Sequence, residues 1–552
     1  MHKMVSLQTN ASKVALAGLL AASLCGGSMM VGASTAYAGE VTISKTATET
    51  DANALSYNAF KLFNATKNDD GSVSSITWVN DDIKNAVRGV ITANDPAYAG
   101  GTNAQAAAEW IASKVTGTGS TTIVDASSIA NQIAVAVSGK AAATETLGSG
   151  TATTLESGYW LFVTNSNSTQ NAVDNAGTSP IFAVVGGDAL TITPKTGTPT
   201  VNKTIKNDQT DKYGKVADSQ VGQDVEYELA GTVASNIATY STYSYTFTDK
   251  LSAGIELTRI NDVKVAIDGT DVTAEATIGY ADNTLTVAFD NLFAAKGGIN
   301  ANSKVTVTYK AKLTSAAVIG GAGNPNTVTL TYSNNPNTDT NTDSKGTSTP
   351  STARDYAFKL HLVNSDKATN QKLAGAKFTI QPTEANGAGS KNLYVQADGT
   401  LGPQAYEFKT SADGTFDVAG LDAGTYTVTE VAVPSAAGSP DVAYKPLSSS
   451  FTFTIAPEYN ADTQTLTNLG LTVAGNANAI AGLDTSNNNT LDADDGSAVN
   501  TAHGMVNVTV ANEKAIKLPL TGEQGIALVM GAGLVIVAVS AMSLSRRRRE
   551  ED

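Results

Sequence analysis

Three polar residues stand at positions where the strand alternation of this chain otherwise places apolar side chains. In the stretch "VNKTIK", Lys203 lies on the same strand face as Val201 and Ile205. Asp249 takes such a position in "YSYTFTD", and Asn334 takes one in "TVTLTYSNN". The alternation therefore predicts that an amine, a carboxyl and a carboxamide face one core.

These three groups could form a covalent bond. Burial lowers the pKa of a lysine and raises the pKa of a carboxyl, so both groups tend to lose their charge in a core. A neutral Lys203 amine could attack the Asn334 carboxamide while a protonated Asp249 polarises it, and ammonia would leave. The new amide bond would restrict the unfolded chain as a disulfide does. The alternative is that all three residues lie at strand ends and extend their polar groups to solvent.

The segment around these residues has the pattern of an all-β domain. Apolar residues recur at every second position, as expected for strands with one buried and one solvated face. The alternating stretches are Val225–Val233, Tyr243–Leu251, Leu285–Leu292, Lys304–Leu313 and Thr327–Asn335. Turn residues separate them, so we expect a β-sandwich of the immunoglobulin-like kind.

Two breaks in the pattern divide the chain into three domains. "TPKTGTPT" (Thr193–Thr200) and the polar stretch Thr340–Asp355 lack apolar periodicity. We expect domains at 39–195, 196–350 and 351–515. The first also has a helical stretch, Asn103–Val115, beside strands at Gly158–Asn165 and Pro180–Val185, which predicts a mixed sandwich with inserted helices.

Both ends of the chain have features of an exported protein. Residues 1–38 have a basic start, an apolar middle and a small-residue cleavage site, typical of a signal peptide. Its removal takes away Cys25, the only cysteine. Near the other end, Ile526–Leu544 is uncharged and long enough to cross a hydrocarbon core of about 30 Å. The basic cluster Arg546–Arg549 follows and predicts that everything before the helix lies outside the cell.

Composition excludes several classes of function. The formal net charge of −15 argues against binding nucleic acid or anionic lipid. Without the signal peptide the histidines are His361 and His503, and no cysteine remains, so zinc clusters and Cys–His catalysis are not expected. The acidic stretch Leu491–Val499 lacks the ligand spacing of a calcium loop. We expect no metal, no cofactor and no enzyme active site.

The residues before the uncharged segment resemble the LPXTG sorting signal of Gram-positive surface proteins. The motif residues are Leu518, Pro519, Leu520, Thr521 and Gly522. The membrane helix and arginine tail follow in the order that this signal has. The resemblance implies that a sortase cleaves after Thr521 and passes its carbonyl to an amine, while the helix holds the precursor at the membrane.

The identity of that amine separates two functions. "ALTITPKTG" resembles the pilin motif of sortase-built pili, which implies that Lys195 receives the carbonyl of the next copy; Gly186 and Thr193 depart from the residues preferred there. An ordinary solvated linker lysine is the alternative. If the amine belongs to cell-wall peptidoglycan instead, the chain is a monomeric wall-anchored adhesin that binds a host or matrix ligand.

The whole layout resembles the SpaA-type major (backbone) pilins. The family's middle domain has an internal isopeptide bond between a lysine and an asparagine, with a catalytic aspartate, and the resemblance assigns these roles to Lys203, Asn334 and Asp249. It implies a structural subunit of a covalent pilus (fimbria) that serves in surface attachment. The implied partners are a sortase, other copies of the chain, peptidoglycan, minor pilins and host surface ligands.

The third segment resembles a Cna protein B-type domain in "LAGAKFTI" (Leu373–Ile380) and "GTYTVTEVAVP" (Gly424–Pro434). The resemblance assigns the catalytic carboxyl to Glu430 and the terminal asparagine to Asn512. The family's reactive lysine position holds Asn364 here, and the nearby Lys359 faces away from the core by parity. Hydrogen bonds among Asn364, Glu430 and Asn512 are therefore the alternative to a bond.

Overall fold

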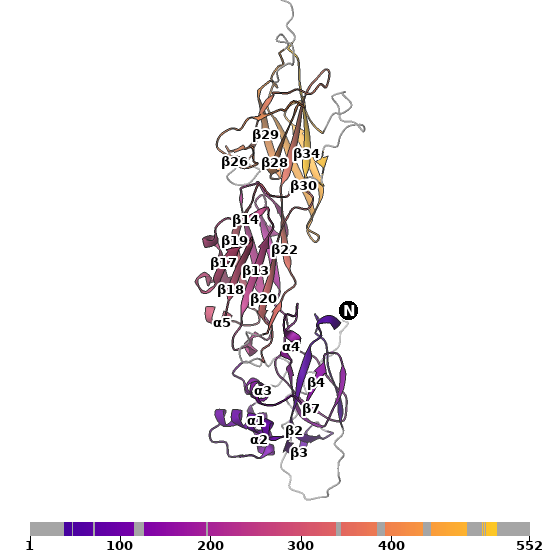
Figure 1. Cartoon of the computed structure of the whole chain (residues 1–552), viewed down its shortest axis with the longest axis vertical. Coiled ribbons are helices and arrows are strands. Elements are labelled where there is room, and N and C mark those ends of the chain that lie inside the picture. Colours follow the sequence, from indigo (N-terminus) through magenta and orange to yellow (C-terminus); the bar gives the residue numbers. More distant parts are fainter. Residues whose placement is uncertain are drawn as a thin grey trace, which may run out of the picture.

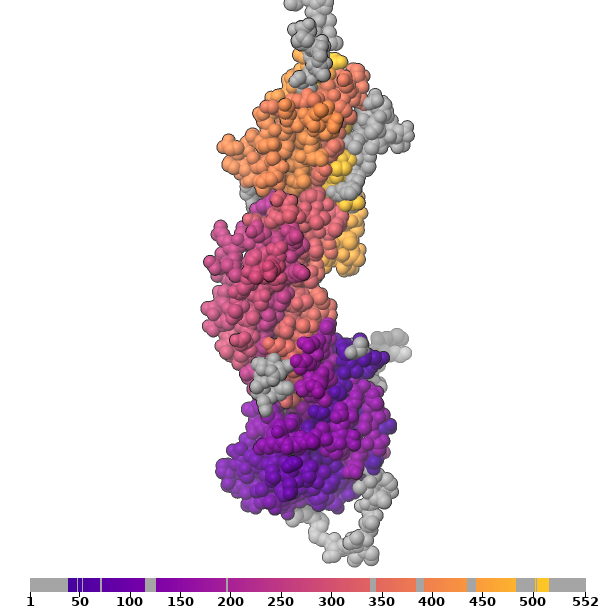
Figure 2. Space-filling view, viewed as in Figure 1, coloured from indigo at the N-terminus to yellow at the C-terminus, as the bar shows by residue number. Residues whose placement is uncertain are grey.

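Three β-rich domains follow one another along the long axis of the molecule (Figure 1). The computed structural model describes residues 38–46, 48–69, 72–114, 126–194, 197–337, 344–383, 392–433, 443–482, 499–500, 502 and 504–515. In the space-filling view the indigo N-terminal, magenta middle and orange C-terminal domains form one elongated column (Figure 2). The protein is mainly β, as the sequence predicts.

The N-terminal domain has a five-stranded sheet with helices on one face and a small sheet on the other. The larger sheet has the order β3-β2-β6-β7, with β4 paired to β2: Val73–Trp78, Ser56–Lys67, Gly158–Thr164, Ile181–Val185 and Glu145–Gly148. The smaller sheet has the order β5-β1-β8: Ala152–Leu155, Gly39–Ile43 and Leu190–Ile192. The helices are α1 (Asp81–Asn94), α2 (Ala104–Lys114), α3 (Ile129–Lys140) and the short α4 (Ser166–Thr169).

The sequence of this domain accounts for a fully buried strand and for the starts of two helices. Every residue of β6 is buried, because one face of its sheet packs on helices and the other on the small sheet. The strand therefore reads as a continuous run, "GYWLFVT", rather than as an alternation. The helices start at polar caps: the Asn80 side chain accepts a hydrogen bond from the Ile83 amide at α1, and Ser128 accepts one from Asn131 at α3.

The middle domain is a sandwich of two seven-stranded sheets. The first has the order β10-β9-β12-β19-β15-β16, with β14 also on β19: Lys212–Gly214, Val201–Asn207, Asp224–Thr232, Lys304–Leu313, Lys264–Ile267, Thr270–Asp271 and Ile255–Leu257. The second has the order β11-β22-β20-β13-β18-β17, with β21 also on β20: Val216–Asp218, Ser351–Tyr356, Asn324–Ser333, Tyr245–Leu251, Thr284–Phe289, Thr277–Ala281 and Lys345–Thr347. A helical turn, α5, spans Leu292–Ala295. The alternation in β12, β19 and β20 turns one face of each strand into a shared core.

Two boundaries in this domain differ from the sequence prediction. Strand β20 begins at Asn324, three residues earlier than expected, and ends at Ser333, so Asn334 lies just beyond it. Strand β22 pairs with β11 and β20, although its residues follow the expected domain boundary at 350. We therefore propose that the middle domain extends through Tyr356.

The C-terminal domain is a second sandwich, with two five-stranded sheets. One has the order β28-β23-β34-β32, with β33 also on β34: Thr415–Leu421, Phe358–Asp366, Met505–Asn512, Ala479–Ala481 and Val499–Asn500. The other has the order β27-β24-β29-β30-β31: Phe408–Lys409, Lys377–Pro382, Gly424–Ala432, Phe451–Asn460 and Thr465–Ala474. A small hairpin joins β25 (Tyr394–Val395) to β26 (Leu401–Gly402).

Hydrogen bonds between the middle and C-terminal domains fix their junction. The Gln220 side chain donates to the Gly399 carbonyl and accepts from the Tyr426 hydroxyl at 2.9 Å. The Tyr459 hydroxyl donates to Asp218 at 2.9 Å. These side chains are buried or partly buried, so the two sandwiches meet through a specific polar contact.

Candidate functional site

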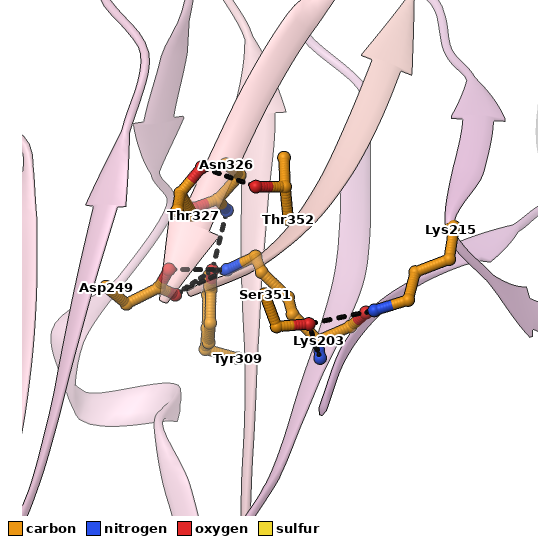
Figure 3. Close-up of polar contacts among 8 residues, drawn as sticks. All are labelled: Lys203, Lys215, Asp249, Tyr309, Asn326, Thr327, Ser351 and Thr352. Atoms are coloured by element: carbon orange, nitrogen blue, oxygen red, sulfur yellow. Dashed lines mark hydrogen bonds and ion pairs between the residues drawn. The ribbon is translucent and has the colours of Figure 1, made fainter. Parts of the chain in front are cut away.

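Lys203 and Asp249 form a buried ion pair between the two sheets of the middle domain. Lys203 lies on β9, where it pairs with Leu229 of β12, and Asp249 lies on β13 in the opposite sheet. The Lys203 Nζ lies 2.6 Å from both carboxylate oxygens, and neither side chain is exposed (Figure 3). The structure therefore brings together two of the three residues that the sequence singled out.

Asn326 and Tyr309 complete the cluster. Asn326 lies on β20 diagonally across from Asp249, which pairs with Val328, so both side chains point into the core. The Tyr309 hydroxyl lies 2.7 Å from the Lys203 Nζ, 2.7 Å from the Asn326 Nδ2 and 2.5 Å from an Asp249 oxygen (Figure 3). An amine, a carboxyl and a carboxamide thus meet around one hydroxyl.

Burial prepares the amine for chemistry. It lowers the pKa of Lys203 from its ordinary value to about 8, although the neighbouring Asp249 carboxyl opposes that shift. The rings of Tyr227 and Tyr309 stack at 5.4 Å, and the Lys203 Nζ lies 5.1 and 5.2 Å from their centroids. A lowered pKa increases the fraction of neutral amine, the form that acts as a nucleophile.

The backbone of Lys203 is also held in place. Its amide donates to the Ser351 hydroxyl at 2.9 Å, and its carbonyl accepts from the Lys215 Nζ at 2.8 Å. Lys215 donates to Ser351 as well, at 2.8 Å (Figure 3). Ser351 belongs to β22, so these bonds tie β9 to the opposite sheet beside the cluster.

Asn334, which the sequence analysis assigns as the bond partner, lies elsewhere. It follows the end of β20, six residues beyond the Val328 position that pairs with Asp249, which is about 20 Å along an extended strand. Its side chain donates to the Thr169 carbonyl at 2.5 Å and accepts from Ser344 at 2.8 Å. The assignment of Asn334 to the Lys203 cluster is therefore wrong: this residue joins the middle domain to the N-terminal domain.

The sequence contained a signal for the position of Asn326 in this cluster. Asn326 has the same parity as Val328, Leu330 and Tyr332, which are all buried. It was missed because the strand was expected to begin at Thr327, which left Asn326 in a turn. Tyr309 was missed because a tyrosine in an apolar alternation is an ordinary core residue until its hydroxyl is placed.

The C-terminal domain holds a related but incomplete cluster. The Asn512 Nδ2 donates to the two Glu430 oxygens at 2.9 and 3.2 Å. Burial raises the pKa of Glu430 above its usual range. Asn364 is fully buried, and among the described residues neither its Nδ2 nor its Oδ1 has a hydrogen-bond partner. Lys359 faces outward and pairs with Asp417 at 2.6 Å, so it does not take the place of Asn364.

The remaining predicted elements lie outside the described residues. They are Lys195, the sorting motif at 518–522, the membrane segment at 526–544, the basic cluster at 546–549 and residues 1–37 of the signal peptide. The part of the chain that the structure describes contains no helix with the length and apolar character needed for a membrane crossing. Within the same residues, no group of three or more His, Cys, Asp or Glu side chains is arranged to hold a metal ion.

Two family models match parts of the chain. Residues 358–469 match the SpaA prealbumin-like fold domain, and residues 511–552 match the LPXTG cell wall anchor motif. The chain therefore has a SpaA-type prealbumin-like domain and the anchor of a cell-wall-attached surface protein. Neither model describes an enzyme family. A comparison with curated protein sequences finds no match.

Three solved structures of pilins match the chain at low sequence identity. The T6 backbone pilin of serotype M6 Streptococcus pyogenes covers 88% of this chain, with all of its own length, at a TM-score of 0.51 and 12% identity. The major pilin SpaD of Corynebacterium diphtheriae covers 88% of this chain and 99% of its own, at a TM-score of 0.45 and 15% identity. The major pilin RrgB of Streptococcus pneumoniae covers 65% of this chain and 83% of its own, at a TM-score of 0.38 and 14% identity. The first likeness supports the multi-domain fold.

Proposed function

We propose that the chain is the major structural subunit of a sortase-assembled covalent pilus. In this proposal a sortase cleaves after Thr521 and joins its carbonyl to Lys195 of the next copy. The last subunit is joined to peptidoglycan, and the fibre serves in surface attachment. The wall anchor, the SpaA-type domain and the column of three domains support this function (Figure 2).

The observation that carries the proposal is the buried cluster of Lys203, Asp249 and Asn326. We propose that the Lys203 Nζ attacks the Asn326 carboxamide, that Asp249 is the catalytic carboxyl, and that ammonia leaves. The product would join β9, the first strand of the middle domain, to β20 in the opposite sheet. This reaction occurs once within each chain and does not make the protein an enzyme.

The position of the bond suits a chain that is pulled from both ends. Lys203 follows the proposed acceptor Lys195 by eight residues, so a force applied at Lys195 acts on the bond through only a short length of chain. The load then passes from Lys203 to Asn326 without extending the more than one hundred residues between them.

Polymerisation can be tested on material released from cell walls with muramidase. On a denaturing gel we expect a ladder for the parent chain and a single band for Lys195→Ala. Lys206→Ala is the matched control, because Lys206 is a nearby lysine that forms an exposed ion pair with Asp211. A single band for the parent chain would contradict the fibre and favour the monomeric adhesin.

The internal bond can be tested by mass spectrometry of protease fragments of the full chain. We expect a branched peptide that contains Lys203 and Asn326 and is lighter than the sum of its two component peptides by one ammonia. Asn326→Ala should abolish this peptide, whereas Asn334→Ala should leave it intact. The reverse result would restore Asn334 as the partner and overturn the geometry proposed here.

A further inference from the structure

The Tyr309 hydroxyl occupies the centre of the middle-domain cluster. It contacts the nucleophilic amine of Lys203, the Asp249 carboxyl and the nitrogen that must leave Asn326. We propose that Tyr309 is a catalytic residue of the cross-linking reaction, and that its hydroxyl carries the proton from Asp249 to the departing Asn326 nitrogen. This inference rests on the proposed Lys203–Asn326 bond.

The Tyr309 hydroxyl has the hydrogen-bond partners that a relay needs, and protonation of Asp249 would reverse the direction of the bond between these two groups. A phenol has one proton to donate and an oxygen that can accept. The Tyr309 hydroxyl donates to Asp249 Oδ2 and accepts from both the Lys203 Nζ and the Asn326 Nδ2. Because both nitrogens lie 2.7 Å from the same oxygen, the amine and the carboxamide are within two hydrogen-bond lengths of each other.

The reaction needs such a relay because an amide nitrogen leaves poorly unless it is protonated. Among the described residues, no hydrogen bond joins Asp249 directly to Asn326, whose Nδ2 donates to Tyr309. Water is a poor substitute, since Lys203, Asp249 and Asn326 are fully buried and Tyr309 is 2% exposed. The path from the carboxyl to the leaving nitrogen therefore passes through the phenol.

The proton transfers balance as follows. Lys203 first gives one proton to Asp249, which produces a neutral amine and a carboxylic acid. The amine then forms a bond to the Asn326 Cγ, which leaves a positive charge on the Nζ and a negative charge on the Oδ1. Asp249 gives its proton to Tyr309 while Tyr309 gives its own to Nδ2. The C–N bond breaks, the Oδ1 becomes the carbonyl oxygen of the new amide, and the Nζ returns a proton to Asp249, so the products are the new amide, ammonia and a neutral carboxylic acid.

The environment keeps the phenol protonated for this role. Burial, together with the neighbouring Asp249, raises the pKa of Tyr309 well above its ordinary value. The hydroxyl therefore neither loses its proton to solvent nor competes with Asp249 as a base. It exchanges one proton for another, as a relay must.

The test follows bond formation after synthesis of the full chain in a cell-free system, by the amount of branched Lys203–Asn326 peptide at each time. Tyr309→Phe keeps the ring and removes the hydroxyl, and we expect it to slow bond formation by about 10²-fold to 10⁴-fold, the usual contribution of a positioned acid or base. Tyr245→Phe is the matched control, because Tyr245 is buried in the same core and its hydroxyl donates to the Thr232 carbonyl at 2.7 Å. The control should form the bond at the parent rate.

The experiment distinguishes a failure of the role of Tyr309 from a failure of the proposed bond. Equal rates for the parent chain and a folded Tyr309→Phe would overturn the role of Tyr309, whereas a parent chain without the branched peptide would overturn the proposed bond itself. If Tyr309→Phe does not fold, fluorinated tyrosine at position 309 keeps the hydroxyl and nearly the same shape. We then expect a rate that follows the acidity of the phenol, with no such effect at position 245; a rate independent of acidity would also overturn the relay.

Discussion

The middle and C-terminal sandwiches contain related polar clusters that differ in one group. The middle cluster has an amine, a carboxyl and a carboxamide in Lys203, Asp249 and Asn326. The C-terminal cluster has the carboxyl and the carboxamide in Glu430 and Asn512, but Asn364 stands where the amine is expected. Without a nucleophile, the two remaining groups are joined to each other by hydrogen bonds.

The difference also changes the energetics of burial. A fully buried lysine and aspartate lose more hydration than their attraction returns unless further bonds compensate. Formation of an amide would remove both charges, so the middle cluster would gain stability from the proposed reaction. The C-terminal cluster has no such gain. The two side-chain polar atoms of Asn364 have no hydrogen-bond partner among the described residues, which should cost this domain about 1–3 kcal/mol each.

The largest expected effect follows removal of the middle-domain amine. Lys203→Met should abolish the bond and lower the free energy of unfolding by about 4–5 kcal/mol, the range for opening a closed loop of about a hundred residues. Calorimetry of the full chain would show the middle-domain transition at lower temperature. Lys206→Met, on the outer face of the same strand, is the control. An unchanged transition in Lys203→Met would mean that no cross-link strengthens this domain.

The next prediction restores the missing amine in the C-terminal domain. Asn364 and Asp366 of β23 pair in parallel with Val510 and Asn512 of β34, and position 364 faces the core. Asn364→Lys should therefore form a bond to Asn512 with loss of one ammonia, and stabilise the domain by up to about 4 kcal/mol. Mass spectrometry and calorimetry would measure both effects.

The control for this gain in stability is a double variant that has the new lysine but lacks the Glu430 carboxyl. Asn364→Lys combined with Glu430→Gln should keep the full mass and be less stable than the parent chain, because a buried lysine then has no partner. If the single variant also keeps its full mass, the two clusters are not equivalent, and the comparison between the domains fails.

Strand alternation was enough to predict the sandwiches and two members of the buried middle-domain cluster. Lys203 and Asp249 were found because a charge in an apolar alternation is conspicuous, and the structure buries both. Asn326 was not found, because the parity rule applies only after the strand's ends are known, and the Asn-Pro-Asn start of β20 reads as a turn. Asn334 satisfied the parity rule equally well, and only the register against Asp249 separates the two asparagines.

The contacts at the domain junctions could not be predicted from the sequence for a related reason. The sequence places Asn334 and Asn335 at the end of a strand and Asn337 in the polar stretch after it, and all three are buried at a junction that the sequence does not predict. Their side chains donate to backbone carbonyls of Thr169, Thr164 and Thr178 in the N-terminal domain. Contacts between residues more than 150 positions apart have no local periodicity, so no pattern along the chain indicates them.

A smaller effect should follow loss of the Asn334 side chain, and it sharpens the distinction from Asn326. Asn334→Ala removes one donor and one acceptor from the buried junction, which should weaken it by about 1–3 kcal/mol. We expect faster hydrogen exchange in residues 164–178 and no change in the branched Lys203 peptide. Asn202→Ala, at an exposed position on β9, is the control. Exchange unaltered by Asn334→Ala would show that the junction does not depend on this residue.

The smallest expected effect concerns pH and separates the two clusters once more. Because burial raises the pKa of Glu430 in the folded domain, this group binds its proton more tightly there than in the unfolded chain. Its contribution to stability is therefore complete below the ordinary pKa of a glutamate and disappears as pH rises through the raised value. We expect the C-terminal transition to fall by no more than a few degrees across this range in the parent chain.

Glu430→Gln should flatten that pH dependence, because an amide does not titrate, while keeping a hydrogen-bonding group beside Asn512. Glu407→Gln, which changes a half-exposed acid of the same domain, should leave the dependence in place. A Glu430→Gln profile parallel to that of the parent chain would assign the pH dependence to other groups. In that case the Glu430 carboxyl of the parent chain would stabilise the C-terminal cluster through its hydrogen bonds alone. It would lack the raised pKa that an acid needs to keep its proton beside an attacking amine.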